Sequence, residues 1–213
     1  MESDLRSPGS YFLKSLDEYL KQKRRTITGD TLFKLYSDCN SEITRYKGNS
    51  HGFHGLSEFL IFRYFFHTFG GNFTAKKISR DTYEFVSETD SSLRIGQGIP
   101  VHSFHKRHHP DIVIFDAGGV RSVIQIKNQI AEGINELRQE VSTFETLWQK
   151  YPEMHSLLVI FHGDINPAEI SYLEKIQKDT TWFTYVILEG NHRNFEEIAD
   201  FTVKTKDKTL SAA

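Results

Sequence analysis

The chain has 213 residues, of which 38% are hydrophobic and 25% charged, a composition typical of one compact globular domain, with room for a small appended subdomain. The formal net charge of −2 excludes a uniformly basic protein, so any attraction to phosphate has to come from local patches. A single cysteine, Cys39, excludes an internal disulfide framework, and we expect it to be a buried, unreactive thiol.

The sequence gives no sign of a membrane segment. The N-terminus lacks a basic stretch followed by an apolar one, and the most apolar run, residues 59–69, is interrupted by Arg63 and is too short to span a bilayer. We therefore expect a cytoplasmic protein that does not enter a membrane.

Three helices are predicted before any strand. They begin at small polar residues suited to N-caps and cover about residues 10–25, 30–46 and 57–69, with Ser10, Asp30 and Ser57 as the caps. Gly70-Gly71 is expected to stop the third helix. Residues 72–101 mix short strand-like pieces with turn residues, and no element boundary is predicted there.

The pattern is clearer after Asp111. Residues 111–116, DIVIFD, and 120–127, VRSVIQIK, are apolar strands around an AGG turn, which predicts an antiparallel hairpin. A helix at about 131–150, a strand in 156–163, a helix in 166–179 with Asn166 as its cap and Pro167 in its first turn, and a strand in 181–190 are predicted to follow. This order indicates a mixed α/β fold.

Two polar side chains interrupt the apolar strand 120–127. Because side chains alternate along a strand, Gln125 and Lys127 share one face, and the hairpin could bring the carboxylate of Asp111 close to them. A carboxylate, an amide oxygen and a backbone carbonyl are ligands suited to Mg²⁺, and a lysine beside them can orient a water and offset negative charge. The chemistry indicated is attack on phosphorus.

Pro110-Asp111 followed by Gln125-Ile126-Lys127 resembles the motif of the PD-(D/E)xK nuclease superfamily. The resemblance implies a restriction-endonuclease-like α-β-β-β-α-β core from about residue 56 to 189, flanked by helices. It implies that Asp111 binds the metal, that Gln125 is the second ligand and that Lys127 is catalytic, with a further ligand in the Ile126 carbonyl. Glu58 occupies the place of the acid that many members carry on the helix before the sheet.

One residue departs from the usual motif. Gln125 replaces the second acid, as in the Gln-x-Lys version of Mrr-type restriction endonucleases, and a neutral amide binds a cation less strongly than a carboxylate.

The resemblance also implies a function and an organisation. It predicts a Mg²⁺- or Mn²⁺-dependent phosphodiesterase that cleaves nucleic acid, DNA rather than RNA, as a restriction, defence or repair endonuclease. Residues 1–50 are predicted to be a helical extension packed on a nuclease-like core of residues 51–213. A homodimer is expected, since one active site cuts one strand.

Other interpretations of the same residues remain open. Asp111 could cap the entry to a strand, while Gln125 and Lys127 could be solvent-facing and protective residues of an edge strand. Glu58 suits the first turn of a helix without any catalysis. The chain could also be a non-catalytic nucleic-acid-binding or assembly module, or a ligand-sensing or protein-interaction domain, which predicts that Lys127 is exposed and far from Asp111.

The segment 101–110, VHSFHKRHHP, is rich in histidine and contains two further basic residues. It holds four of the ten histidines, and its candidate phosphate-facing residues are His105, Lys106, Arg107, His108 and His109. A solvated loop, or a metal site made by His102, His105 and His109, are the alternatives. On the helix near 131–150, the polar residues Glu136, Arg138, Gln139 and Glu140 are predicted to face solvent.

Overall fold

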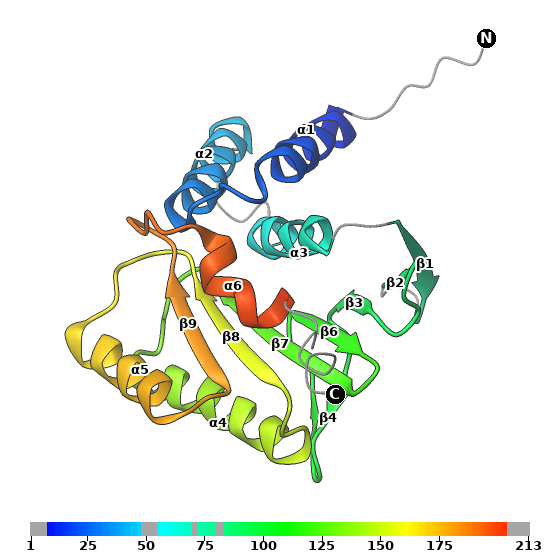
Figure 1. Cartoon of the computed structure of the whole chain (residues 1–213). Helices are drawn as coiled ribbons and strands as arrows, with labels where there is room; N and C mark the ends of the chain where they lie inside the picture. Colours follow the sequence, from blue (N-terminus) through cyan, green and yellow to red (C-terminus); the bar gives the residue numbers. More distant parts are fainter. Residues whose placement is uncertain (1–7, 48–54, 70–71, 80–82, 204–213) are drawn as a thin grey trace.

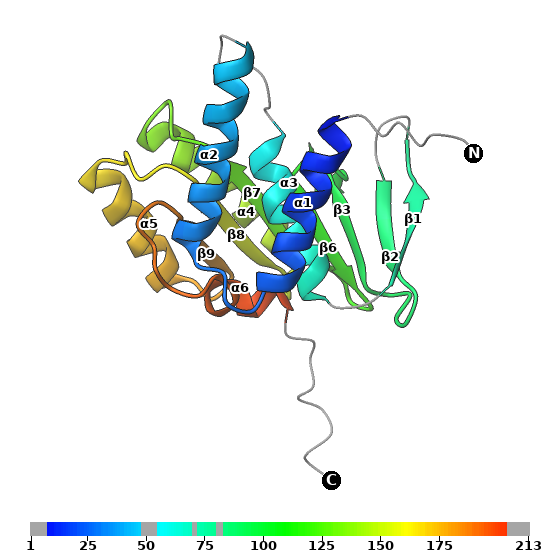
Figure 2. The same ribbon diagram turned by 90° about the horizontal axis from the view of Figure 1, so that it is seen from above.

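The computed structural model describes residues 8–47, 55–69, 72–79 and 83–203. These residues form a mixed α/β fold in which N-terminal helices precede a seven-stranded sheet with helices against both faces (Figure 1). Seen from above, α1, α2 and α3 lie on one side of the sheet, and α4 and α5 lie on the other (Figure 2).

The predicted helices are present, but their caps differ from the prediction. α1 (Pro8–Lys23) begins before Ser10, so that residue lies inside the helix. α2 (Gly29–Lys47) is capped by Thr28, whose hydroxyl accepts a hydrogen bond from the amide of Thr31 at 3.1 Å. Asp30 lies in the first turn of α2 instead of capping it, because Thr28 already satisfies the free amide there.

α3 (Leu56–Thr68) has Gly55 as its N-cap and no capping hydrogen bond from a side chain. Ser57 is therefore not the cap; it lies in the first turn and is buried. The predicted stop at Gly70-Gly71 lies outside the described residues. α1 packs along α3, where Asp17 accepts two hydrogen bonds from Arg63 at 2.5 and 2.9 Å.

The large sheet combines an antiparallel and a parallel half. Its strands, in spatial order, are β1 (Phe73–Lys77), β2 (Tyr83–Ser87), β3 (Arg94–Gln97), β6 (Ile112–Asp116), β7 (Gly119–Lys127), β8 (His155–Ile160) and β9 (Phe183–Ile187). Neighbours from β1 to β7 are antiparallel, and β7, β8 and β9 are parallel. The β6–β7 hairpin confirms the prediction for residues 111–127; its turn is Ala117-Gly118, and Gly119 begins β7 opposite Asp116 with a φ of +107°.

Two further findings concern segments between these strands. Residues 72–101, for which no boundary was predicted, supply β1, β2 and β3 of the large sheet. A separate two-stranded hairpin, β4 (Val101–His102) and β5 (Arg107–His108), joins β3 to β6.

The predicted alternation of β7 is confirmed by the two hydrophobic cores. Ile124 and Ile126 belong to the core under α1, α2, α3 and α6 (Phe195–Val203), whereas Val123 belongs to the core under α4 (Ile134–Lys150) and α5 (Pro167–Asp179). Gln125 and Lys127 therefore project from β7 toward α4. The helix predicted from about residue 131 starts at Ile134.

Three smaller expectations have a clear outcome. Asn166 caps α5 as predicted, accepting from the Glu169 amide at 3.1 Å while the Glu169 carboxylate accepts from the Asn166 amide. Cys39 is buried, and burial raises the pKa of its thiol. Within the parts of the chain that the structure describes, no helix is both long and apolar enough to cross a membrane.

Candidate active site

The predicted site residues gather at one end of the sheet. At this end of the sheet, β3 ends at Gln97, β7 ends at Lys127, and β6 starts just after Asp111. The first turns of α3 and α4 lie at the same end. The carboxyl ends of strands and the amino ends of helices are common places for binding sites in α/β proteins, since the helix dipoles and free backbone groups meet there.

Asp111 is tied to the motif residue next to Gln125 and Lys127. Its Oδ2 accepts a hydrogen bond from the backbone amide of Ile126 at 2.6 Å, and its Oδ1 accepts none from the described residues. Burial raises the pKa of Asp111 from 3.8 to about 7; nearby Glu58 and Glu140 raise it too, while the Ile126 amide and Lys127 lower it. A carboxylate in this position favours a nearby cation.

Glu58 reaches the same region from the first turn of α3. Its Oε2 accepts a hydrogen bond from the side-chain amide of Gln97 at 2.6 Å, which fixes the carboxylate between α3 and β3. Glu58 also raises the pKa of Asp111 through like charge, so the two acids act on each other. Glu58 thus has a defined partner and is not simply a solvent-facing acid in a helix turn.

Lys127 is held by two acids of α4, which the prediction had assigned to solvent. Its Nζ lies 3.0 Å from Glu136 and 2.6 Å from Glu140, and the Lys127 side chain is only 21% exposed. Glu136 and Glu140 are one helical turn apart, so both face β7. The prediction was wrong for these two residues and right for Arg138 and Gln139, which are exposed.

These ion pairs decide the protonation of Lys127. Burial acts to lower the pKa of Lys127, but the hydrogen bonds and opposite charges of Glu140 and Glu136 outweigh it and raise the pKa above its usual value of 10.5. The side chain is consequently a stable cation, suited to donating hydrogen bonds and offsetting negative charge, and unsuited to accepting a proton near neutral pH.

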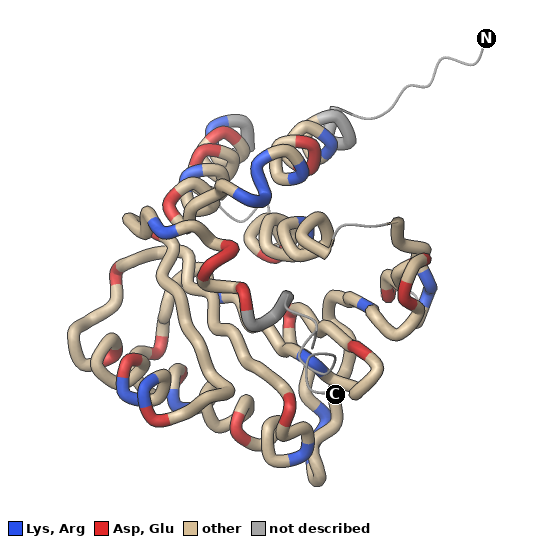
Figure 3. The backbone as a smooth tube through the Cα atoms, in the orientation of Figure 1, with Lys and Arg blue, Asp and Glu red and all other residues tan. Residues whose placement is uncertain are grey.

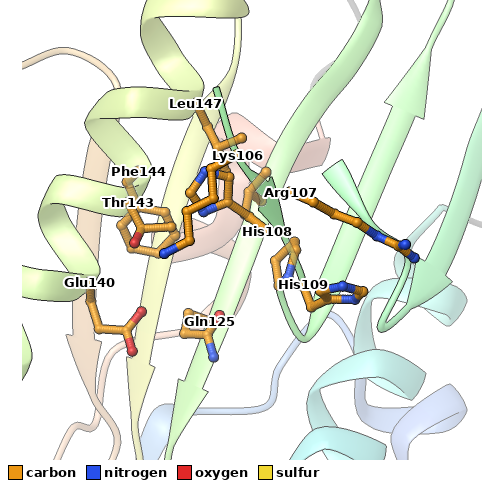
Figure 4. A pocket seen from close by; sticks show the side chains of 11 residues that line it. Lys106, Arg107, His108, His109, Gln125, Glu140, Thr143, Phe144 and Leu147 are labelled. Atoms are coloured by element: carbon orange, nitrogen blue, oxygen red, sulfur yellow. The ribbon is translucent and has the colours of Figure 1, made fainter. Parts of the chain in front are cut away.

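A cavity of about 280 Å³ opens beside Gln125 (Figure 4). In Figure 4, Glu140 and Thr143 of α4 form one side, the segment from Lys106 to His109 forms the other, and Gln125 lies between them. A second cavity, of about 330 Å³, lies along α4 and is lined by Lys127, Glu136 and Glu140. Glu140 lines both cavities, so it links Lys127 to the space next to Gln125.

The candidate phosphate-facing residues divide between this cavity and the hairpin. Lys106, Arg107, His108 and His109 line the cavity, whereas His105 lies at the exposed tip of the β4–β5 hairpin. His108 is directed at Ser103, with 3.1 Å between its Nε2 and the serine Oγ. Burial, with Lys106 and His109 nearby, lowers the pKa of His108, which favours its neutral form.

The donor set for a metal ion is modest. Nowhere in the described parts of the chain do three or more His, Cys, Asp or Glu side chains gather as metal ligands would, which applies to the histidine segment as well as to the acids. Asp111 and Glu58 supply two carboxylates, and the predicted set is completed by neutral oxygens of Gln125 and Ile126. Hard oxygen donors of this kind fit Mg²⁺ or Mn²⁺ and do not fit a soft metal.

The alternatives based on an edge strand fail. β7 is an interior strand between β6 and β8, so Gln125 and Lys127 neither cover nor protect an edge. Lys127 is also neither largely exposed nor remote from Asp111, since its charge lowers the pKa of Asp111. Both observations go against an interaction domain that lacks a site here.

Glu136 and Glu140 are the residues that inspection of the sequence missed. Their spacing of four residues, one turn into the helix that follows the Lys127 strand, was the available signal, since a connection from β7 into α4 brings that face over the strand end.

Comparison of the chain with models of known protein families and with curated proteins finds no match.

Proposed function

We propose that the protein is a metal-dependent phosphodiesterase that cleaves nucleic acid, and that its substrate is DNA. The observation that carries the proposal is the grouping of three side chains at one end of the sheet: half-buried Asp111, which is hydrogen-bonded to the Ile126 amide, and Gln125 and ion-paired Lys127 from the adjacent strand. A half-buried acid before one central strand and a half-buried lysine at the end of the next contribute little to a hydrophobic core, so a functional role explains them better than packing does.

The order of elements supports a restriction-endonuclease-like arrangement. If the outer strands β1 and β2 and the β4–β5 hairpin are left out, the elements α3, β3, β6, β7, α4 and β8 have the order α-β-β-β-α-β, with the first three strands antiparallel and β8 parallel to β7. The Asp111 position at the start of β6 and the Gln125-Ile126-Lys127 run at the end of β7 match the places that the resemblance predicts. We therefore assign α1 and α2 to a helical extension of that core.

The predicted metal ligands are Asp111, Glu58, Gln125 and the carbonyl of Ile126. The charges of Glu58 and Glu140 raise the pKa of Asp111 while that of Lys127 lowers it, and the negative charge gathered around Asp111 favours a divalent cation. Bound Mg²⁺ or Mn²⁺ would supply a Lewis acid for the scissile phosphate.

The protein's own groups have separate roles in this proposal. Asp111 is held in place by the Ile126 amide, and Glu58 by Gln97, so both carboxylates are oriented before substrate arrives. Protonated Lys127 donates hydrogen bonds to the attacking water or to the phosphate and offsets charge that develops there. Glu136 and Glu140 position Lys127 and keep it charged.

The proposal is tested by cleavage of supercoiled plasmid with Mg²⁺, Mn²⁺ or a chelator. We expect nicked and linear products only when metal is present. Asp111→Asn and Lys127→Met should each lower the rate of cleavage by about 100-fold or more. Lys175→Met, at an exposed lysine on α5, is the matched control and should cleave normally. DNA binding by the wild-type chain without cleavage under any metal would instead favour a non-catalytic nucleic-acid-binding module.

A further inference from the structure

The β4–β5 hairpin presents a rigid tip to solvent. Val101 pairs with His108 and His102 with Arg107, which leaves the four residues from Ser103 to Lys106 as the connection, with Phe104 and His105 at its centre. The backbone amide and hydroxyl of Ser103 both donate to the carbonyl of Lys106, at 2.8 and 3.0 Å, and the same hydroxyl accepts from the Lys106 amide at 3.1 Å. The tip is thus held closed at its base.

The base of the hairpin is also attached to α4. The hydroxyl of Tyr151, the residue that follows α4, donates to the carbonyl of His102 at 3.0 Å. Val101 is buried in the core under α4. The hairpin is thus fixed at its tip and at its base. It loses little conformational freedom when it binds a ligand, which favours affinity.

Phe104 is the distinctive residue of the tip. Its side chain is 65% exposed, the highest value among the large hydrophobic residues of the described chain. A single exposed apolar side chain is common on protein surfaces, so exposure alone carries no conclusion. The charges of the residues beside Phe104 indicate what it could bind.

The hairpin segment around Phe104 is basic and contains no acid of its own. Residues 101–110 include Lys106, Arg107 and four histidines, with neither Asp nor Glu. On α2 and α5, by contrast, acidic and basic residues are interspersed (Figure 3). The hairpin therefore combines a ring with local positive charge, the pairing that single-stranded nucleic acid recognises through base stacking and phosphate contacts.

The hairpin leads directly into the candidate active site. Lys106 to Pro110 line the cavity that also contains Gln125 and Glu140, and Asp111 follows Pro110 in the chain. Figure 4 shows this basic wall across the cavity from Glu140. A nucleic-acid strand that runs from the hairpin tip along residues 106–110 would therefore reach the candidate active site.

We infer that the β4–β5 hairpin binds an unpaired nucleotide next to the cleaved bond, with its base stacked on Phe104 and flanking phosphates on Lys106 and Arg107. This inference rests on the proposed function and narrows its substrate to nucleic acid with a single-stranded segment at the cleavage site. An unpaired base is favoured because the ring at the hairpin tip needs a base face free of stacking neighbours, and a single strand offers such a face without the cost of unstacking a duplex step. A lipid surface is disfavoured, since membrane anchoring needs a larger apolar area than one ring among polar residues.

The test measures binding apart from cleavage. The full chain is titrated, with chelator present, against a fluorescent single strand containing 2-aminopurine and against the matching duplex. Phe104→Ala is compared with Phe104→Trp, which keeps a stacking ring, and with Tyr83→Ala, which removes another exposed aromatic residue, on β2.

We expect Phe104→Ala to weaken single-strand binding about tenfold and to reduce the change in 2-aminopurine fluorescence that accompanies binding, whereas Phe104→Trp and Tyr83→Ala retain the affinity and a fluorescence change. Lys106→Ala should lower the slope of log affinity against log salt by about one, and Phe104→Ala should leave that slope unchanged. Equal single-strand affinity of wild type and Phe104→Ala overturns the inference, as does a Phe104-dependent affinity for the duplex or for phosphatidylcholine–phosphatidylserine vesicles instead.

The inference and the proposed function can fail separately. Plasmid cleavage by the wild type together with single-strand binding that ignores Phe104 would remove the hairpin inference and leave the nuclease. Phe104-dependent single-strand binding with no cleavage of that single strand or of plasmid under any metal would support the hairpin and remove the nuclease.

Discussion

Asp111 occupies a position where its negative charge is costly in the metal-free protein. Burial and the like charges of Glu58 and Glu140 disfavour ionisation, and only the Ile126 amide and Lys127 favour it. A buried group of this kind is a common feature of catalytic and metal-binding sites, where local stability is given up for chemistry.

The first prediction concerns the stability of the metal-free protein against pH. The folded state holds the Asp111 proton up to a pKa of about 7, against an ordinary value of 3.8, so the stabilisation from this group is complete below about pH 3.8 and is lost as pH rises to about 7. Asparagine cannot ionise and keeps an oxygen for Ile126. Asp111→Asn should therefore gain in melting temperature relative to wild type between pH 5 and pH 8.

Thermal unfolding in chelator at the two pH values measures this gain. Asp164→Asn, at an exposed carboxylate in the loop before α5, is the control and should show a smaller change. A constant difference between Asp111→Asn and wild type at both pH values would contradict the account of Asp111.

The second prediction concerns the pairing of Lys127 with α4. Lys127→Met leaves the carboxylates of Glu136 and Glu140 without their shared cation, which should lower the free energy of unfolding by about 1–3 kcal/mol. Adding Glu140→Gln to Lys127→Met should restore part of the loss, because the repulsion is relieved. Urea denaturation of wild type, the two single variants and the double variant measures the coupling, and additive effects would show that the Lys127–Glu140 pair contributes nothing to stability.

At the scale of elements, α3 and α4 approach the site from opposite faces of the sheet. α3 belongs to the core that contains Ile124 and Ile126, and α4 to the core that contains Val123. Each helix brings an acid to the sheet end from its amino-terminal half, Glu58 on α3 and Glu140 on α4. The motif on β6 and β7 is thus completed by residues that are distant from it in the sequence.

The third prediction tests the contribution of α3. If Glu58 is a metal ligand, Glu58→Gln should weaken Mg²⁺ binding in calorimetric titration and slow plasmid cleavage together, roughly tenfold or more. The melting temperature should change little, since an amide oxygen can still accept from Gln97. Glu174→Gln, at an exposed acid on α5, is the matched control. Unchanged metal affinity in Glu58→Gln would show that Glu58 is not a ligand and only complements the helix dipole at the start of α3.

At the scale of the whole molecule, the sequence contains one copy of the motif, Pro110-Asp111 followed by Gln125-Ile126-Lys127. One chain therefore has one proposed site. A single site cuts one strand of a duplex, so a double-strand break needs two subunits or two successive events. A twofold dimer is the commonest arrangement that provides two sites.

The fourth prediction follows from that count. Nicked plasmid should accumulate before linear plasmid at low protein concentration, and linear product should rise more steeply than the first power of concentration if dimers make the break. Sedimentation velocity over the same range measures the assembly. Concerted double-strand cleavage by a strictly monomeric protein would contradict a single-site mechanism.

The sequence by itself determined the features that depend on local patterns. Alternation in residues 120–127 assigned Gln125 and Lys127 to one face, the AGG turn predicted the β6–β7 hairpin, and Asn166-Pro167 predicted the start of α5. Each of these follows from side-chain periodicity or from backbone preferences within a few residues, which a linear pattern records directly.

Only the tertiary structure decided which distant groups meet. The pairing of Lys127 with Glu136 and Glu140, the bond from Gln97 to Glu58 and the interior place of β7 all depend on how helices and strands pack. A polar residue on a helix has the same local pattern whether it faces water or a buried lysine, and a strand has the same pattern at an edge or in the interior of a sheet. The partner that distinguishes these cases is far away in the chain, so packing alone determines it.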